Sequence, residues 1–394
     1  MFRNYSRKTA KPHRLRNNES ATFDVLKSAI GLYIHIPFCR RRCGYCAFAT
    51  VANEDRALWE RYLNALRVEM KAWTGVAVDT VFLGGGTPTL WPADLLVRLA
   101  GCLGESFDIN KEAEWTIEGH PSTLIGSEGE GKLVRLVESG FNRLSLGIES
   151  FEAGTLSRLG REYSLEDAAR VISAARAAGF VNINLDLISG WPWEDMSAHR
   201  RSLDQALSLQ PQHMSVYSLK IEEGTPFAKE KISLNCDLQA DYYQMTHETL
   251  AAAGFRHYEV ANFARLGFEA RHNLKYWHYQ DYLGLGAAAS SKINGKSFVN
   301  ARGLDAYLER MQEGLSPAVD EESLDDEEIN RRRTILGLRL GEGVEQALLE
   351  RYGDPEAVNN FRSRGYLVEE NGRSRLTPDG WLVSNQLFIH VLAA

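Results

Sequence analysis

The stretch that decides the fold is Tyr33-Ile-His-Ile-Pro-Phe-Cys39-Arg-Arg-Arg-Cys43-Gly-Tyr-Cys46-Ala-Phe48. It follows a short apolar run and spaces Cys39, Cys43 and Cys46 as C-x3-C-x2-C. Three thiolates can bind three irons of a 4Fe–4S cubane and leave the fourth iron open, whereas structural zinc and electron-transfer clusters normally recruit four protein ligands. The open iron can chelate S-adenosylmethionine, and an electron from the cluster can then cleave its sulfonium to a 5′-deoxyadenosyl radical. The spacing predicts such a cluster, with a structural zinc completed by a remote ligand as the alternative.

The overall composition and charge indicate a globular protein and argue against nucleic-acid-binding and membrane-spanning classes. The chain has 394 residues, of which 44% are hydrophobic and 25% charged, as in ordinary globular proteins. A net charge of −7 offers no general basic excess for phosphates, so we expect no nucleic-acid partner. No apolar run is long enough to cross a bilayer. Five cysteines, three of them clustered, favour metal ligation in a reducing, cytoplasmic compartment, with Cys102 and Cys236 as packed side chains.

Residues 1–30 differ from the rest of the chain. Six cations precede the first acid, Glu19, and no apolar segment accompanies them, which excludes a secretory signal. We expect a basic, flexible N-terminal arm. Organelle targeting and an electrostatic docking role are the alternatives.

Short apolar runs alternate with amphipathic segments through the first two-thirds of the chain. Strands are predicted at residues 32–36, 80–83, 115–118, 143–146, 182–187 and 213–219. Helices are predicted at residues 55–73, 94–103, 132–138, 165–178 and 198–207. Six strands separated by helices predict an α/β fold, a partial (β/α)6 barrel over residues 31–255. In such folds the ligand-binding residues gather at the carboxyl ends of the strands.

The remaining chain is predicted to extend and then leave the barrel. A helix is expected at residues 238–253, and an aromatic-rich segment at 256–316 extends the barrel. Residues 317–328 are acidic and are expected to form a linker or loop. Residues 317–394 are predicted to form a small α+β winged-helix-like domain, with strands near 366–368 and 374–376 and a last helix at 378–391. Because this module has no concentrated basic face, a packing or lid role is expected instead of DNA binding.

Several chemically suited residues follow the predicted strands. Gly84-Gly85-Gly86-Thr87-Pro88 permits close backbone approach to an amino-acid ligand. Glu118, Glu149 and Asp186 each come at a strand end, and Glu118 could neutralise the ammonium of the methionine moiety. Any one acid is commonly a capping or solvated residue, but their joint position favours a ligand site.

Arg40, Arg41 and Arg42 lie between the first two cysteines. Three fixed positive charges can raise the cluster potential or attract an acidic electron donor such as a flavodoxin. The alternative is a solvated loop.

From about residue 32 to its end the chain resembles the coproporphyrinogen-dehydrogenase-like branch of radical SAM proteins, and within it the HemW-type heme chaperones. The cysteine loop, the Gly-Gly-Gly-Thr-Pro turn and Arg271-His272-Asn273-Leu-Lys-Tyr276-Trp277 carry the resemblance. It implies S-adenosylmethionine contacts at Tyr33, Tyr45, Gly85, Gly86, Thr87, Glu118, Glu149, Arg161, Asp186 and Lys220. It implies heme contacts at His272, Asn273, Tyr276 and Trp277.

The resemblance also separates two activities. The dehydrogenases carry a further cysteine two positions after the third ligand, where this chain has Phe48. The resemblance therefore implies a chaperone that binds heme or a related porphyrin and passes heme to an acceptor protein, including a membrane-associated one reached by peripheral contact. His272 offers an imidazole to iron, and Tyr276 and Trp277 could stack on a porphyrin. The alternative for His272 is a histidine satisfied inside an aromatic core cluster with Tyr279 and Tyr282.

The chain departs from the family at three positions. Glu149 stands where Gln is usual, His120 follows Gly119 where Asn is common, and Ser290 replaces a histidine. These departures leave a second hypothesis open, a radical SAM enzyme. Such an enzyme would be either coproporphyrinogen III dehydrogenase-like or a HemN-like methyltransferase or cyclopropanase that uses two S-adenosylmethionines.

Overall fold

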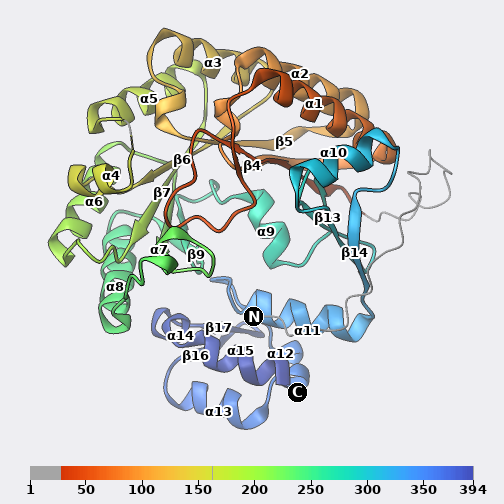
Figure 1. The fold of residues 1–394 in the computed structure, drawn as a ribbon. Coiled ribbons are helices and arrows are strands. Elements are labelled where there is room, and N and C mark those ends of the chain that lie inside the picture. Colours follow the sequence, from red (N-terminus) through yellow and green to blue (C-terminus); the bar gives the residue numbers. More distant parts are fainter. Residues whose placement is uncertain (1–27, 162, 394) are drawn as a thin grey trace.

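The computed structural model describes residues 28–161 and 163–393 (Figure 1). Residues 1–27 of the predicted basic arm lie outside the described residues. No helix in the described ranges is both long and apolar enough to cross a bilayer.

One large sheet organises the barrel. Within the described residues it contains twelve strands in the order β14-β13-β12-β11-β1-β4-β5-β6-β7-β8-β10-β9. Neighbouring strands from β11 to β8 run parallel, and the strands at both edges are antiparallel. The parallel strands are β1 (Ile30–Ile36), β4 (Ala77–Gly85), β5 (Asp108–Gly119), β6 (Arg143–Glu149), β7 (Asn182–Ser189), β8 (His213–Ser218) and β11 (Tyr282–Leu285). The edges are β9 (Arg256–Glu259), β10 (Asn262–Ala264), β12 (Ser290–Ile293), β13 (Lys296–Asn300) and β14 (Ala318–Ser323).

Helices follow the strands as the alternation predicted, and Figure 1 shows α1, α2, α3 and α5 along the outside of the sheet. They are α1 (Arg56–Met70), α2 (Ala93–Ser106), α3 (Gly126–Glu138), α4 (Ala153–Arg158), α5 (Leu165–Ala178), α6 (Met196–Ser208), α7 (Pro226–Lys229), α8 (Cys236–Ala252), α9 (Arg271–Trp277) and α10 (Leu304–Gln312). Helix α5 matches its prediction because its ends are encoded locally. Ser164 and Asp167 form a capping box, and Gly179 ends the helix at a φ of 112°.

Side chains alternate between the two faces of each strand. In β6, Leu144 and Leu146 point outward and are fully buried under the helices. Arg143, Ser145 and Gly147 take the other parity and line a cavity inside the barrel. The apolar core therefore lies between sheet and helices, and the barrel interior is polar.

The C-terminal module packs against the β9 edge of the barrel. Its helices are α11 (Asp326–Gly337), α12 (Gln346–Tyr352), α13 (Pro355–Ser363), α14 (Pro378–Leu382) and α15 (Ser384–Ala393), and its strands are β15 (Val344–Glu345), β16 (Leu367–Glu370) and β17 (Arg373–Leu376). It has a hydrophobic core of its own, which includes Leu349, Phe361 and Leu387. Trp381 packs on His257 of β9, with ring centroids 4.4 Å apart.

Two expectations for this part of the chain differ from the structure. The acidic segment 317–328 is not a linker: β14 pairs with β13 in the main sheet and α11 begins at Asp326. Acidic residues suit an edge strand because their side chains stay in water. An acidic composition therefore does not distinguish an edge strand from a loop. The expected boundary at residue 317 therefore falls before the last strand of the main sheet. The last predicted helix is divided at Val383 into α14 and α15.

Candidate cofactor site

A cavity of about 560 Å³ opens at the carboxyl ends of the parallel strands. It is bounded by the loop after β1 and by residues at or after the ends of β4 to β8. The residues predicted from the sequence that line it are Cys39, Cys43, Cys46, Tyr45, Gly85, Gly86, Thr87, Glu118, Glu149, Arg161, Asp186 and Lys220. Tyr33 does not line it; its hydroxyl lies 3.0 Å from His35 Nδ1. The fold thus brings together segments from Cys39 to Lys220.

The cysteine loop is held by backbone hydrogen bonds. Strand β2 (Phe38–Cys39) pairs with β3 (Val51–Ala52), and the Asn53 amide donates to the Cys39 carbonyl at 3.0 Å. All three thiols are partly buried. Among the described residues no three His, Cys, Asp or Glu side chains converge as one metal ion would need. A cubane does not need this convergence, because each thiolate binds a different iron, so the three cysteines fit that group.

The glycine turn after β4 lies directly against the cysteine loop. The Gly86 amide donates to the Ile36 carbonyl and the Thr87 amide to the Phe38 carbonyl, both at 2.8 Å. A Cβ on Gly86 would lie 2.5 Å from the Phe38 oxygen, and Gly85 has a φ of 113°, so other residues would clash or be strained. The Thr87 hydroxyl donates to Cys39 Sγ at 3.6 Å. The turn therefore places backbone groups beside the predicted cluster ligands.

Two acids face the interior of the cavity. Glu118 accepts a hydrogen bond from the Gly85 amide at 3.0 Å. Burial, and secondarily the charge of Asp186, raises the pKa of Glu118 to about 7. Asp186 accepts from Ser145 at 3.0 Å and from Asn184 at 2.8 Å, and burial also raises its pKa. Both carboxyl groups are thus buried acids that line the cavity.

Glu149 and Arg161 form a buried ion pair. Arg161 Nη2 lies 2.5 Å from Glu149 Oε1 and donates to the Tyr45 hydroxyl at 2.8 Å. Burial raises the pKa of Glu149, and the Arg161 charge opposes that rise. Glu149 has a φ of 72° where the pairing of β6 with β7 shifts register, a bulge that redirects its side chain. The bulge connects the end of β6 to the cysteine loop through Arg161 and Tyr45.

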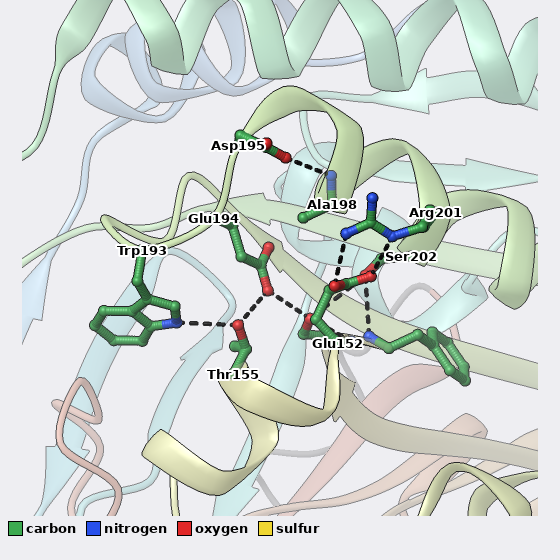
Figure 2. Close-up of polar contacts among 10 residues, drawn as sticks. Glu152, Thr155, Trp193, Glu194, Asp195, Ala198, Arg201 and Ser202 are labelled. Carbon is green, nitrogen blue, oxygen red and sulfur yellow. Dashed lines mark hydrogen bonds and ion pairs between the residues drawn. The ribbon is translucent and has the colours of Figure 1, made fainter.

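A polar network supports the segment between Glu149 and Arg161 (Figure 2). Glu194 accepts hydrogen bonds from the hydroxyls of Ser150 and Thr155, and Trp193 Nε1 donates to Thr155 at 3.0 Å. The Phe151 amide donates to Ser202 Oγ at 3.0 Å. These bonds tie α4 and the residues after β6 to α6 and to the loop before it.

The rim of the cavity is basic and carries an exposed aromatic side chain. Phe48 is 69% exposed. Arg40 lies 3.3 Å from Glu54, and Arg42 Nε donates to the Cys46 carbonyl at 3.2 Å. Lys220 is exposed and pairs with Glu222 at 2.6 Å.

The predicted heme residues do not share one surface. Helix α9 lies at the amino ends of the strands, where the backbone amides of Arg271 and His272 donate to Glu114. His272 is fully buried, with Nδ1 2.9 Å from Thr80 Oγ1 and Nε2 2.7 Å from the Tyr276 hydroxyl. Burial, and then the charge of Lys275, lowers its pKa to about 3. The structure therefore places His272 in an aromatic core.

The other three residues of the motif point in different directions. Asn273 lines the cavity, whereas Trp277 faces the C-terminal module, where the Arg339 guanidinium lies 5.8 Å from its ring. Tyr276 packs edge-on against Tyr282 with centroids 4.5 Å apart. In this conformation neither ring nitrogen of His272 is open to iron.

Some cavity residues escaped the sequence prediction. Arg143, Asn184 and Tyr217 also line the cavity. A signal was available in β6, where Arg143, Ser145, Gly147 and Glu149 alternate with apolar residues. This period of two indicates that one face of the strand is polar and meets a cavity.

Comparison with known proteins identifies the superfamily. The model of the radical SAM superfamily matches residues 33–203. The solved structure of coproporphyrinogen III oxidase (HemN) from Escherichia coli has a TM-score of 0.82 and 24% identity, and the match covers 95% of this chain and 93% of that one. At that identity the likeness establishes the fold, a radical SAM partial barrel with the C-terminal extension.

Sequence relatives identify the family. The heme chaperone HemW of Bacillus subtilis is 34% identical over 92% of this chain and 98% of its own length. The heme chaperone HemW of Mycobacterium tuberculosis strain H37Rv is 32% identical over 90% and 93% of the two chains. The superfamily match implies a 4Fe–4S cluster and S-adenosylmethionine. The chain belongs to the radical SAM superfamily and, within it, to the family of the HemW proteins.

Proposed function

We propose that this protein is a heme chaperone that binds a 4Fe–4S cluster, S-adenosylmethionine and heme, and transfers heme to an acceptor protein. The observation that carries the proposal is the similarity to curated heme chaperones over nearly the whole length of both chains. Phe48 supports it, because no thiol stands at the position where the dehydrogenases carry a further cysteine.

In this proposal Cys39, Cys43 and Cys46 hold the cluster, and the residues around the same cavity hold S-adenosylmethionine. When bound, the two groups supply one-electron chemistry at the mouth of the barrel. Glu118 takes the ammonium of the methionine moiety, and the Gly85–Gly86 backbone lies against its amino-acid part. Arg161 holds Tyr45 and Glu149 in place around the remainder of the ligand, which the short contacts among the three side chains support.

Heme binding by His272 requires a change in conformation. Coordination of iron would break the bonds from its ring to Thr80 and Tyr276, and α9 would have to leave its place against Glu114. The His-Asn-x-x-Tyr-Trp motif then has one of two roles. Either His272 binds heme in a second conformation, or the motif is a structural support that holds Asn273 at the cavity.

A second candidate function is a radical SAM enzyme that acts on a small substrate. The observation that favours it is that Arg143 and Tyr217 also line the cavity, although neither is assigned to S-adenosylmethionine. In either function the exposed arginines of the rim suit an acidic electron donor.

The deciding experiment rebuilds the cluster anaerobically on the full chain. Iron content, S-adenosylmethionine binding and the Soret absorbance on heme titration are measured, followed by heme transfer to apomyoglobin as a test acceptor. Stoichiometric heme binding with transfer supports the chaperone. No heme binding, together with release of 5′-deoxyadenosine on adding coproporphyrinogen III, rejects it in favour of the enzyme. Cys236→Ser, which changes an exposed cysteine on α8, is the matched control.

A further inference from the structure

The inner end of the cavity contains a buried arginine that no group among the described residues neutralises by direct contact. Arg143 is 2% exposed, and its side chain forms no hydrogen bond or ion pair with any residue that the structure describes. A buried guanidinium is costly to leave unpaired, because it has lost water and gained no acceptor. Such a group calls for a partner that residues 28–161 and 163–393 do not supply.

Neighbouring polar atoms at the same level also lack partners. Register places Thr116 of β5 and Asn182 of β7 directly beside Arg143 of β6. Thr116 Oγ1, Asn182 Oδ1 and Arg143 Nε are all buried without a hydrogen-bond partner. Asn273 of α9 lines the same cavity, and its side chain has no hydrogen bond to the described residues. Of these four residues, Arg143 and Asn273 line the cavity.

The nearby acids do not complete the site. The Arg143 charge opposes the rise that burial causes in the pKa values of Glu118 and Asp186, but neither carboxyl group forms an ion pair with it. Asp186 is held by Ser145 and Asn184, and Glu118 by the Gly85 amide. Two basic side chains that sense the Arg143 charge, His213 and His272, are buried, and burial lowers the pKa of each. Among the described residues that line the inner cavity, Arg143 is therefore the one cation.

We propose that Arg143 and Asn273 form a carboxylate-binding subsite at the inner end of the cavity, occupied by a carboxylate-bearing ligand that lies beside S-adenosylmethionine. A guanidinium presents parallel N–H donors that match a carboxylate, and the Asn273 amide supplies a further donor. Two sources offer this chemistry: a propionate of a tetrapyrrole, or the carboxylate of a second S-adenosylmethionine. Binding of a tetrapyrrole propionate rests on the proposed function, whereas binding of a second S-adenosylmethionine does not.

The test uses the full chain with its cluster rebuilt, in wild-type form and as Arg143→Gln and Asn273→Asp. Asn273→Asp keeps Arg143 and the barrel floor but supplies an internal carboxylate that competes with the ligand, so it remains informative if Arg143→Gln folds poorly. Arg98→Gln removes a cation from an exposed position on α2 and serves as the control. Heme and heme dimethyl ester are titrated in the presence of S-adenosylmethionine, and labelled S-adenosylmethionine is counted by equilibrium dialysis.

The two sources give different results. If a propionate occupies the subsite, both variants weaken heme binding by about tenfold or more, and the ester binds wild type as weakly as heme binds the variants. If a second S-adenosylmethionine occupies it, the dialysis count falls by one molecule in both variants while heme affinity stays unchanged. Variants that match wild type and Arg98→Gln in both measurements overturn the subsite. Wild-type protein that binds no heme contradicts the proposed function, and the dialysis then decides the subsite alone.

Discussion

The two distinctive motifs of this chain lie at opposite ends of the same barrel. The cysteine loop lies at the carboxyl ends of the strands, where its thiols are partly buried and open onto a cavity of about 560 Å³. The His-Asn-x-x-Tyr-Trp helix lies at the amino ends, where His272 is fully buried and bonded through both ring nitrogens. The first has the accessibility that a cofactor site needs, and the second has the bonding of a structural core.

This difference teaches that chemical suitability and accessibility are separate properties. A thiol or an imidazole is equally visible in a sequence wherever it lies. Only the packing decides whether its lone pairs are available to a metal. Variants in the cysteine loop should therefore lose bound iron, whereas variants in the His-Asn-x-x-Tyr-Trp helix should lower the free energy of unfolding.

The largest effect is expected at the cysteine loop. Cys39→Ser should reduce the iron bound after anaerobic reconstitution nearly to zero, because a cubane held by three thiolates cannot tolerate the loss of one. Iron analysis and the visible absorbance of the cluster measure this. Cys236→Ser should keep the wild-type iron content. A cluster that survives Cys39→Ser would contradict the assignment of the ligands.

Breaking the buried ion pair should have the next largest effect. Arg161→Ala leaves the Glu149 carboxylate buried without its partner and should lower the free energy of unfolding by about 3–5 kcal/mol. S-Adenosylmethionine binding should weaken as well, since Tyr45 loses its contact. Urea unfolding and ligand titration measure the two effects. Glu149→Gln keeps an acceptor for Arg161 and should cost much less, and equal losses in both variants would argue against the pair.

At the opposite end, His272→Ala should chiefly destabilise the protein. It removes a buried ring and leaves the hydroxyls of Thr80 and Tyr276 unpaired, at a cost of about 2–4 kcal/mol in the free energy of unfolding. His278→Ala, at a half-exposed position just beyond α9, is the control. A His272→Ala protein with wild-type stability and no heme binding would instead show that the motif contacts heme directly.

The binding of S-adenosylmethionine should depend on pH through Glu118. Its pKa of about 7 means that the carboxyl is largely protonated at pH 6 and ionised at pH 8, so affinity should rise by about tenfold across this range. Glu118→Gln should flatten the profile. Folding raises this pKa from 4.5, so the contribution of Glu118 to the stability of the empty protein is present at low pH and is lost as the pH rises through about 7. A pH-independent affinity would remove Glu118 from the ammonium site.

The smallest effect is expected at the outer edge of the network in Figure 2. Arg201 is 61% exposed and pairs with Glu152 at 2.8 Å. Because water screens such a pair, Arg201→Gln should change the free energy of unfolding by less than about 1 kcal/mol. Thr155→Val, which removes a hydroxyl between Glu194 and Trp193, should cost more. The reverse order would mean that the surface pair and not the buried hydroxyls fixes this segment.

The sequence allowed most of the barrel to be predicted, because its signals are local. Alternating strands and helices, the capping box of α5 and the cysteine spacing each depend on residues close together in the chain. Local signals did not reveal β14, whose acidic residues resemble a loop until β13 pairs with them. They also did not reveal the burial of His272, which depends on Thr80 and Glu114, far away in the sequence. The alternation in β6 could have placed Arg143 on the polar face of the strand, but its lack of a partner exists only in three dimensions.

The pairing of β2 with β3 has a consequence for how the protein matures. Backbone hydrogen bonds between β2 and β3 close the loop that carries the thiols. We therefore expect the loop to keep its shape before iron arrives, and assembly of the inorganic core to be a late step on an already folded chain. By the same reasoning, a centre destroyed by oxygen can be restored in place without unfolding the barrel around it.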